Sequence, residues 1–453
     1  MREGALRVAV VGAGPSGVYA TQALSSREDH VFDVDLFDAL PVPFGLVRYG
    51  VAPDHLSIRG VRDTLDKTLD NPGVQFVGNV VVGTDITLEQ LRSDYDAVIL
   101  TYGASSDQRL GIEGEDLPGS IAATDLVAWY CGHPDGERIH MEGVISGATS
   151  AVVVGVGNVA VDVARILAKE PGALDSTDMP QHVLEALSDT SITDIHVLGR
   201  RGPVQASFTT KELKELGELT DVDVIVRPED LNLDPVSATS VADNKVAGRN
   251  LEVLREWSMR TPTGARRRLH MNFFSRPVEV VGEDRVTGVL VERTSLSIDG
   301  SLSGTGEKEL LPAQLVVRSV GYRGVGIAGV DVDPSTGTIA NEDGRVLDAQ
   351  GPTPGLYVAG WIKRGPSGII GTNKKCATAT VESVVADVEA GVLSTPDAPG
   401  SVLLHLSQRD GPVITSQGWR SINTAEQDLG ATRARERTTI HQRADLIRAA
   451  QSE

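Results

Sequence analysis

Residues 7–17 read Arg-Val-Ala-Val-Val-Gly-Ala-Gly-Pro-Ser-Gly, an apolar run that leads into three closely spaced glycines. The apolar half predicts a buried β-strand, and the stretch 16–25 predicts an α-helix. Between them, Gly12 permits a tight turn, Gly14 lets the backbone approach a phosphate, and Gly17 lets the helix pack close to the strand. This GxGxxG pattern is typical of nucleotide sites, but it is weak when it stands alone.

An acidic residue at the end of the next strand strengthens this interpretation. A strand is predicted over 32–37, and it ends in Asp38, 26 positions after Gly12. A carboxylate in that place can accept hydrogen bonds from both hydroxyls of a ribose. The alternative is an ordinary strand–helix turn with a surface aspartate. Because the strand, the glycines, the helix and the carboxylate agree, we expect a dinucleotide site in the N-terminal region.

A second strand, turn and helix are predicted in 150–168, where Gly155-Val156-Gly157-Asn158-Val159-Ala160 forms a GxGxxA turn. The strand expected at 194–198 leads into Arg200 and Arg201 instead of an acidic residue. Two adjacent guanidinium groups suit a ribose 2′-phosphate, which they can meet with charge-assisted hydrogen bonds. This pattern predicts a second dinucleotide, NADP(H) rather than NAD(H). The alternative is a solvated basic turn.

Strands that alternate with helices in both regions predict an α/β fold with two parallel, doubly wound sheets. Further apolar strands are predicted at 314–320 and 356–359. The simplest arrangement is two Rossmann-like dinucleotide-binding domains, one inserted in the other. The first domain would comprise residues 1–104 and 324–453, and the inserted domain residues 105–323.

Composition excludes several other classes of protein. The 453 residues include 42 basic and 62 acidic side chains, a net charge of −20 that disfavours binding to nucleic acid. No run of 18 apolar residues occurs, so no membrane insertion is expected, and the N-terminal residues lack a targeting pattern, which favours a cytoplasmic protein. The two cysteines, Cys131 and Cys376, cannot form a CxxC redox pair, and the nine histidines show no metal-ligand spacing.

Two segments are more distinctive than the glycine turns: Leu-Pro-Val-Pro-Phe-Gly-Leu-Val-Arg at 40–48 and Gly-Trp-Ile-Lys-Arg-Gly-Pro-Ser-Gly at 360–368. Both resemble the ferredoxin–NADP reductases of the adrenodoxin-reductase type. Shorter matches extend this resemblance over nearly the whole chain, at 50–55, 78–80, 155–165, 197–203 and 208–213. The resemblance implies a glutathione-reductase-like flavoprotein architecture with FAD in the discontinuous domain and NADP(H) in the inserted one. It also implies hydride transfer from NADPH to FAD, followed by one-electron transfers to a small iron–sulfur ferredoxin.

The resemblance further implies which residues contact the two cofactors. The flavin contacts, beside the glycine turn, are Ser16, Asp38, Leu46, Val82, Trp361, Gly368, Ile369 and Ile370. The NADP contacts are Val156, Gly157, Asn158, Val159, Arg200, Arg201, Glu212 and Gly368. The family usually has glutamate where this chain has Asp38, so a longer or water-mediated ribose contact is expected.

His55 is expected beside the flavin ring, where it could bond Glu212 or Glu215 and help to seat the nicotinamide. The alternative for His55 is a histidine at a helix start near the surface, and the alternative for Trp361 is a core tryptophan. A ferredoxin partner, which is generally acidic, would need a local basic face on this acidic chain. The candidates are Lys211, Lys214, Arg266, Arg267, Arg268, Arg276, Lys363 and Arg364, with a solvated hairpin as the alternative for the arginine triplet.

Other functions fit the same architecture. One is a diaphorase-like enzyme, which reduces small acceptors, or the small subunit of a multi-subunit synthase. A glutamate-synthase-type subunit would carry a cysteine-rich iron–sulfur segment, which two cysteines cannot supply. Another is a flavoprotein that binds the cofactor but serves only as an interaction scaffold. The sequence does not indicate an oligomeric state.

Overall fold

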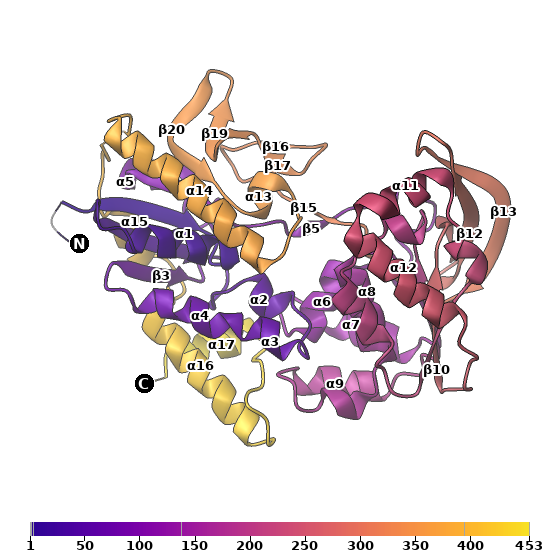
Figure 1. The fold of residues 1–453 in the computed structure, drawn as a ribbon. Coiled ribbons are helices and arrows are strands. Elements are labelled where there is room, and N and C mark those ends of the chain that lie inside the picture. Colours follow the sequence, from indigo (N-terminus) through magenta and orange to yellow (C-terminus); the bar gives the residue numbers. More distant parts are fainter. Residues whose placement is uncertain (1, 3, 137, 394, 453) are drawn as a thin grey trace. The chain divides into compact units, whose positions relative to one another are not determined.

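The computed structural model describes residues 2, 4–136, 138–393 and 395–452 (Figure 1). The chain forms two compact units. The first unit comprises Met1–Ser106, Cys131–Asp135 and Tyr322–Glu453. The second comprises Asp107–Tyr130 and Gly136–Gly321, so it is inserted in the first. Short strands β5 (Ser106–Asp107) and β15 (Tyr322–Arg323) lie where the chain passes from one unit to the other.

The first unit is built on a seven-stranded sheet of order β18-β19-β20-β4-β1-β2-β3, in which β20, β4, β1, β2 and β3 are parallel. The strands of this sheet are β1 (Leu6–Val11), β2 (Phe32–Asp38), β3 (Val74–Gly78), β4 (Ala97–Leu100), β18 (Asn341–Glu342), β19 (Arg345–Asp348) and β20 (Gly351–Val358). A separate two-stranded sheet consists of β16 (Val332–Asp333) and β17 (Thr338–Ile339). The inner strands β1 and β4 are apolar and almost fully buried, whereas β2 alternates buried apolar residues with half-buried aspartates.

The helices of this unit come from both ends of the chain. They are α1 (Pro15–Ser25), α2 (Leu46–Tyr49), α3 (Leu56–Arg59), α4 (Val61–Asp66), α5 (Leu88–Asp94), α13 (Trp361–Arg364), α14 (Ile370–Glu389), α15 (Ser401–Ser407), α16 (Ser416–Ala431) and α17 (Arg443–Ala450), with a 3₁₀ turn at Lys67–Asp70. Pro15 starts α1, where its fixed φ suits the first helical position. α1 and α14 lie side by side, so the N-terminal and C-terminal parts of the chain share one helical layer (Figure 1).

The second unit has a six-stranded sheet of order β6-β14-β7-β8-β10-β9, in which every pair is parallel, and a three-stranded antiparallel sheet, β11-β12-β13. Its strands are β6 (Ser120–Ala122), β7 (Ser150–Val154), β8 (Asp194–Leu198), β9 (Val222–Val226), β10 (Arg267–Asn272), β11 (Ser275–Gly282), β12 (Val286–Leu296), β13 (Leu302–Pro312) and β14 (Leu315–Arg318). Its helices are α6 (Ala123–Tyr130), α7 (Arg138–Ser146), α8 (Asn158–Ala168), α9 (Gln181–Ser188), α10 (Thr210–Leu216), α11 (Pro235–Asp243) and α12 (Lys245–Ser258), with 3₁₀ turns at Pro171–Leu174, Pro203–Gln205 and Pro228–Leu231.

The α/β class with two Rossmann-like parallel sheets is confirmed. The strands predicted at 7–11, 32–37, 150–154 and 194–198 coincide with β1, β2, β7 and β8 to within a residue. The prediction at 356–359 was too short: β20 begins at Gly351 because its first residues pair antiparallel with β19. The strand predicted at 314–320 is shorter in the structure, where β14 ends at Arg318.

Residues 131–135 were not foreseen as part of the first unit. The Cys131 thiol lies 3.5 Å from the carbonyl oxygen of Val51, and the rings of Tyr49 and His133 pack edge to face, with centroids 4.8 Å apart. These contacts hold the segment against the first unit. Among the described residues, no helix has both the length and the apolar character needed to cross a membrane.

A buried ion pair links β1, an inner strand of the first sheet, to the C-terminal helix α15. The Asp94 carboxylate is fully buried, pairs with Arg7, and accepts hydrogen bonds from the backbone N–H groups of Gly400 and Val402, the latter at 2.7 Å. Asp94 therefore joins the start of β1, the end of α5 and the start of α15.

We expect Asp94→Ala to lower the free energy of unfolding by about 3–5 kcal/mol, because it removes the nearest carboxylate of a buried guanidinium and leaves two backbone donors without their acceptor. Asp63→Ala is the matched control, since the Asp63 side chain is 76% exposed and its pairing with Arg62, at 3.5 Å, is worth about 0–1 kcal/mol. Urea denaturation followed by circular dichroism checks both variants. Equal stability of the two variants would contradict the assigned role of Asp94.

Candidate dinucleotide-binding sites

The first glycine turn has the shape that a dinucleotide phosphate requires. Gly12 has a φ of +108°, and a Cβ there would lie 2.6 Å from Tyr102 Cα. A Cβ at Gly17 would lie 1.8 Å from the Gly12 carbonyl oxygen, so only glycine lets α1 start this close to β1. At Gly14, by contrast, the nearest atom to a Cβ is Gly45 Cα, 4.0 Å away. The backbone at Gly14 is therefore accessible to a phosphate at the N-terminus of α1.

Asp38 holds this turn through its carboxylate. One carboxylate oxygen accepts the backbone N–H of Ala13 and the other that of Leu40, both at 2.8 Å. Burial raises the pKa of Asp38 to about 6, although these two N–H groups favour the ionised form. Each oxygen keeps acceptor capacity for a ribose hydroxyl. Asp38 thus joins the glycine turn at Ala13 to the loop after β2 at Leu40. Its carboxylate can still accept the ribose hydrogen bonds expected of it.

The 40–48 segment, which the resemblance singled out, lies on the same turn. The Phe44 N–H donates to the Ala13 carbonyl oxygen at 2.7 Å. Gly45, which the sequence analysis had not chosen, has a φ of +45°, and a Cβ there would lie 3.0 Å from Gly14 Cα. Leu46 begins α2 directly after it and is half-buried. The structure therefore brings the two motifs together around Gly14.

Ser16 and Trp361 lie near this turn on different elements. A Cβ at Gly360, the residue before Trp361, would lie 2.2 Å from Ser16 Oγ, and Ser16 Oγ donates to Asn373 Oδ1 at 3.1 Å. Trp361 begins α13, is half-buried and packs on Tyr322, with ring centroids 5.5 Å apart. Among the described residues, no acceptor bonds its buried indole N–H. This unpaired donor fits the polar ligand expected there.

The Gly365–Gly368 turn opens a helix, as expected. α14 begins at Ile370 after Gly368, whose φ of +83° restricts the position to glycine. Ile369, between Gly368 and the first residue of α14, is 68% exposed. The first N–H groups of a helix have no partner within it, so the start of α14 offers donors to a ligand. Val82 lies after β3 and packs partly buried against the apolar core of the first unit.

The second glycine turn is built in the same way within the second unit. Gly155 has a φ of +133°, and a Cβ there would lie 2.1 Å from the Ser319 carbonyl oxygen. The Val156 carbonyl oxygen accepts the Ser207 N–H at 2.9 Å, and Asn158 Oδ1 accepts the Thr209 N–H at 2.8 Å. Gly157 precedes α8, and Val159 lies half-buried in its first turn. These bonds fix the turn against the start of α10.

Arg200 and Arg201 follow β8, and both are exposed. Their backbone is fixed, since the Arg200 carbonyl oxygen accepts from Thr294 Oγ1 at 2.8 Å and that of Arg201 from the Phe274 N–H at 3.1 Å. Within the described part of the chain, neither guanidinium is engaged by an acidic side chain. A Cβ at Gly199 would lie 2.9 Å from Val156 Cγ1. The residue before the arginine pair is therefore packed against the glycine turn. The arrangement fits a 2′-phosphate.

The three residues proposed to seat the nicotinamide are divided between the units. His55 lies in the first unit, where it is 9% exposed and precedes α3. Glu212 is buried in α10 and accepts a hydrogen bond from Thr209 Oγ1. Glu215, one turn further along, lies 3.6 Å from the buried Arg165 guanidinium. The structure thus places Glu212 and Glu215 on one helix, with Glu215 already engaged.

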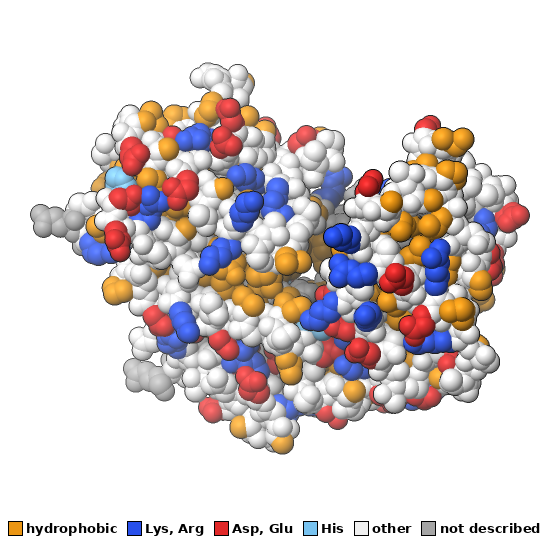
Figure 2. Space-filling view, viewed as in Figure 1, with side chains coloured by type: hydrophobic (Ala, Val, Ile, Leu, Met, Phe, Trp, Pro, Cys, Tyr) orange, Lys and Arg blue, Asp and Glu red, His pale blue; other side chains and the backbone are white. Residues whose placement is uncertain are grey.

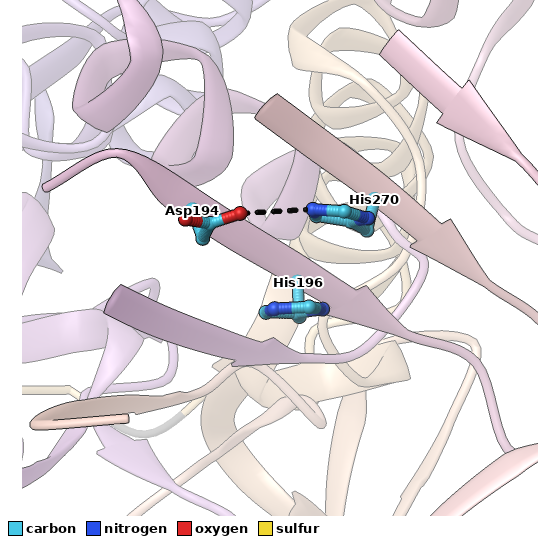
Figure 3. Close-up of side chains that lie close together, drawn as sticks. All are labelled: Asp194, His196 and His270. Carbon is cyan, nitrogen blue, oxygen red and sulfur yellow. Dashed lines mark hydrogen bonds and ion pairs between the residues drawn. The ribbon is translucent and has the colours of Figure 1, made fainter. Parts of the chain in front are cut away.

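The structure brings together one cluster that the sequence analysis missed. Asp194, His196 and His270 lie on the neighbouring strands β8 and β10, and the two imidazole rings stack with centroids 4.4 Å apart (Figure 3). His196 and His270 are brought together by the parallel pairing of β8 with β10. The spacing of histidines along the sequence does not reveal this pairing. Burial lowers the pKa of His196 to about 4 and also lowers the pKa of His270, so both rings are neutral at pH 7.

The donor set of this cluster nevertheless argues against a metal. The Asp194 carboxylate accepts two hydrogen bonds from Arg268, at 2.7 and 2.5 Å, another from Thr193 Oγ1 at 3.0 Å, and contacts His270 Nε2 at 3.2 Å. These contacts fill its acceptor capacity. The Arg268 guanidinium also holds the pKa of Asp194 well below its usual range. A cation would have to displace Arg268, so we interpret the cluster as an ion-paired structural group.

The arginine triplet does not lie in a hairpin, and its middle member, Arg267, is buried and cannot contribute to a basic face, whereas the side chains of Arg266 and Arg268 are 53% and 51% exposed. Arg267 lies in the parallel strand β10, is 1% exposed and pairs with Glu170 at 2.8 Å. Arg266 faces the same carboxylate, and Arg268 pairs with Asp194. Of the other candidates, Arg276 pairs with Glu292, Lys363 bonds Thr380 and Arg364 bonds Asn373, whereas Lys211 and Lys214 are exposed on α10. On the face that Figure 2 shows, acidic and basic side chains are interspersed.

Comparison with known proteins agrees with this geometry. A family model described as an NAD(P)-binding Rossmann-like domain matches residues 10–62. The NADPH-ferredoxin reductase FprA of Mycobacterium tuberculosis is 43% identical over 455 residues, which cover 97% of this chain and 98% of that protein. The mitochondrial NADPH:adrenodoxin oxidoreductase of Arabidopsis thaliana is 38% identical, over 98% of this chain and 95% of that protein.

Solved structures give the same result. The structure of Mycobacterium tuberculosis FprA in complex with NADPH aligns with a TM-score of 0.92 and 42% identity, covering 99% of this chain and 100% of that one. Both the identity and the coverage are far above what a shared fold alone requires. The chain therefore belongs to the family of the FprA-type NADPH-ferredoxin reductases and the NADPH:adrenodoxin oxidoreductases.

Proposed function

We propose that this chain is a cytoplasmic NADPH:ferredoxin oxidoreductase, which takes a hydride from NADPH onto a noncovalently bound FAD and passes electrons singly to a small iron–sulfur ferredoxin. The observation that carries the proposal is the near-full-length similarity to FprA, at 43% identity. Two glycine turns with different chemistry beside them, a carboxylate at Asp38 and guanidinium groups at Arg200 and Arg201, support two different dinucleotides.

In this proposal the discontinuous domain, expected from the sequence as residues 1–104 and 324–453, binds FAD, and the inserted domain, expected as 105–323, binds NADP(H). FAD would be held by Gly12, Gly14, Ser16, Gly17, Asp38, Leu46, Val82, Trp361, Gly368, Ile369 and Ile370. NADP(H) would be held by Val156, Gly157, Asn158, Val159, Arg200, Arg201, Glu212 and Gly368. The open backbone at Gly14 and the unpaired Trp361 N–H support the first assignment.

Bound FAD supplies the redox chemistry that the side chains lack, because it can accept a hydride and release electrons one at a time. The side chains provide position and electrostatics. The N-terminus of α14 would present N–H groups and the positive end of the helix dipole to developing negative charge. Arg200 and Arg201 would hold the 2′-phosphate, and His55 with Glu212 would orient the nicotinamide. Glu215 is the weaker candidate because it faces Arg165.

The function is tested by adding NADPH to the purified protein without oxygen and then adding an oxidised ferredoxin. We expect NADPH to bleach the flavin band and ferredoxin to speed its return. Ferredoxin turnover should fall as the Debye length shrinks from about 10 Å at about 0.1 M salt to about 3 Å at about 1 M. A small uncharged acceptor should be much less affected by salt.

The two exposed lysines of α10 make this test specific. Lys211→Glu with Lys214→Glu should raise the KM for ferredoxin, whereas the matched control, Lys245→Glu with Lys308→Glu, reverses two other exposed lysines of the same unit and should not. Bleaching by NADPH without acceleration by any ferredoxin would favour a diaphorase-like enzyme. A yellow protein that NADPH does not bleach would favour a scaffold.

Cofactor preference is expected to depend on the arginine pair. Replacing both Arg200 and Arg201 by alanine should lower kcat/KM for NADPH by about 100-fold or more, since hydrogen bonds to charged groups contribute about 1.5–3 kcal/mol each. NADH should be little affected because it lacks the 2′-phosphate. The control variant, Arg255→Ala with Arg285→Ala, removes two exposed arginines of the same unit. Equal losses with NADPH and NADH would mean that the pair is structural.

His55→Ala and Glu212→Gln are expected to slow reduction of the flavin by NADPH more than they change the FAD content. Glutamine at position 212 can still accept the Thr209 hydrogen bond, so the start of α10 is preserved. Rapid-mixing absorbance measures the reduction rate. The control is Glu218→Gln, at an exposed position in the turn after α10. Parental rates for both variants would remove His55 and Glu212 from the proposed site.

A further inference from the structure

We infer that residues 409–443, here called the C-terminal strap, hold the adenosine end of the flavin site in shape, and that Arg443 is a positioning residue for FAD. This inference rests on the proposed FAD site and deepens it. In open α/β sheets, ligands bind at the carboxyl ends of the parallel strands, and the acidic end of the second strand receives the adenosine ribose. The strap contacts the loops at these strand ends at three places.

The first contact extends the sheet at the end of β3. Gly78 and Ile414 exchange two backbone hydrogen bonds, at 2.8 and 3.0 Å, so the strap pairs with the edge strand. The next residue, Asn79, has a φ of +61°, a conformation that needs support from its surroundings. Its side-chain amide donates to the Pro412 carbonyl oxygen at 3.0 Å, and its own carbonyl oxygen accepts from Arg409.

The second contact is Arg443, which joins three separate segments. Its Nη1 donates to the carbonyl oxygen of Ala39 and to Asn79 Oδ1, both at 3.0 Å. Its Nη2 donates to both oxygens of Asp135, at 3.0 Å. Ala39 directly follows Asp38, so one guanidinium fixes the loop after β2 to the loop after β3. The positive charge of Arg443 also favours the ionised Asp38 carboxylate, against the larger opposing effect of burial on its pKa.

The third contact is a buried cluster of charges beneath the 40–48 segment. The Glu426 carboxylate of α16 is fully buried and pairs with Arg48 and, at 3.4 Å, with Arg437. Beside it, the rings of Phe44 and Trp419 pack edge to face, with centroids 5.5 Å apart. Phe44 donates its N–H to the glycine turn, so the strap supports the residues that surround Gly14.

Together these contacts involve the loops that carry Asp38, Gly45 and Asn79. The partly exposed side chain of Arg443 forms hydrogen bonds with two of these loops, at Ala39 and Asn79. Its side chain is 33% exposed, so a substitution there should be tolerated by the fold better than one at the buried Glu426. Arg443 is therefore the position at which an effect on FAD can be separated from an effect on folding.

The test is to prepare apoprotein, from which the flavin has been removed, and to titrate it with FAD and with FMN, following quenching of flavin fluorescence. FMN shares the flavin ring but lacks the adenosine. We expect Arg443→Met to weaken FAD binding by roughly tenfold or more, since it removes charge-assisted hydrogen bonds that fix the adenosine loops, and to leave FMN binding unchanged. Arg443→Lys should restore part of the FAD affinity, because an ammonium can still bond one of the loops.

The matched control is Arg448→Met, in the same helix, where the side chain is 75% exposed and pairs with Asp445, one turn away. It should bind FAD like the parent. Parental FAD affinity in Arg443→Met, or equal weakening of FAD and FMN, would overturn the inference, because the strap would then have no specific effect at the adenosine end. A parent apoprotein that binds no FAD would instead overturn the proposed function itself, so the two failures are distinguishable.

Discussion

The structure depends on how closely a helix can approach a strand at the first glycine turn. A Cβ at Gly17 would overlap the carbonyl oxygen of Gly12, and a Cβ at Gly12 would overlap the backbone of Tyr102. With glycine at both positions, α1 can start close to the end of β1. The first N–H groups of α1, which have no partner within the helix, then lie next to the accessible backbone at Gly14. Any side chain at Gly17 would push α1 away and separate the helix terminus from the carboxylate of Asp38. The rest of the first site is arranged around this approach.

The second unit repeats the same solution with a different outcome. A Cβ at Gly155 would lie 2.1 Å from the Ser319 carbonyl oxygen, closer than the 2.6 Å between a Cβ at Gly12 and Tyr102 Cα, and both turns precede a helix. What differs is the residue at the end of the neighbouring strand, which is a half-buried carboxylate in one unit and a pair of exposed guanidinium groups in the other. The two turns therefore share one backbone geometry, and in the proposed function the side chains at the strand ends decide which dinucleotide each turn binds.

The sequence was sufficient for features that depend on near neighbours. The glycine turns, the strands that flank them, Asp38 and Arg200 all follow from patterns a few tens of residues long, and the fold class follows from them. The sequence was not sufficient for contacts between distant segments. Arg48 pairs with Glu426 across 378 positions, and Arg443 meets Asn79 across 364, distances at which no periodicity operates. Arg267 was misjudged for the same reason, since only the pairing of β10 shows that it is buried.

The insertion of one unit in the other also has a consequence for synthesis of the protein. β4 has β20 as its neighbour, so the first sheet cannot be completed until residues 351–358 have left the ribosome. Roughly 250 residues separate these strands, a delay of roughly 12–50 seconds at typical elongation rates. During that time the inserted unit has all of its own strands and can fold first. The two glycine turns of a nascent chain would then reach their folded form in sequence, the turn of the inserted unit first, because the sheet that carries the other turn still lacks β20.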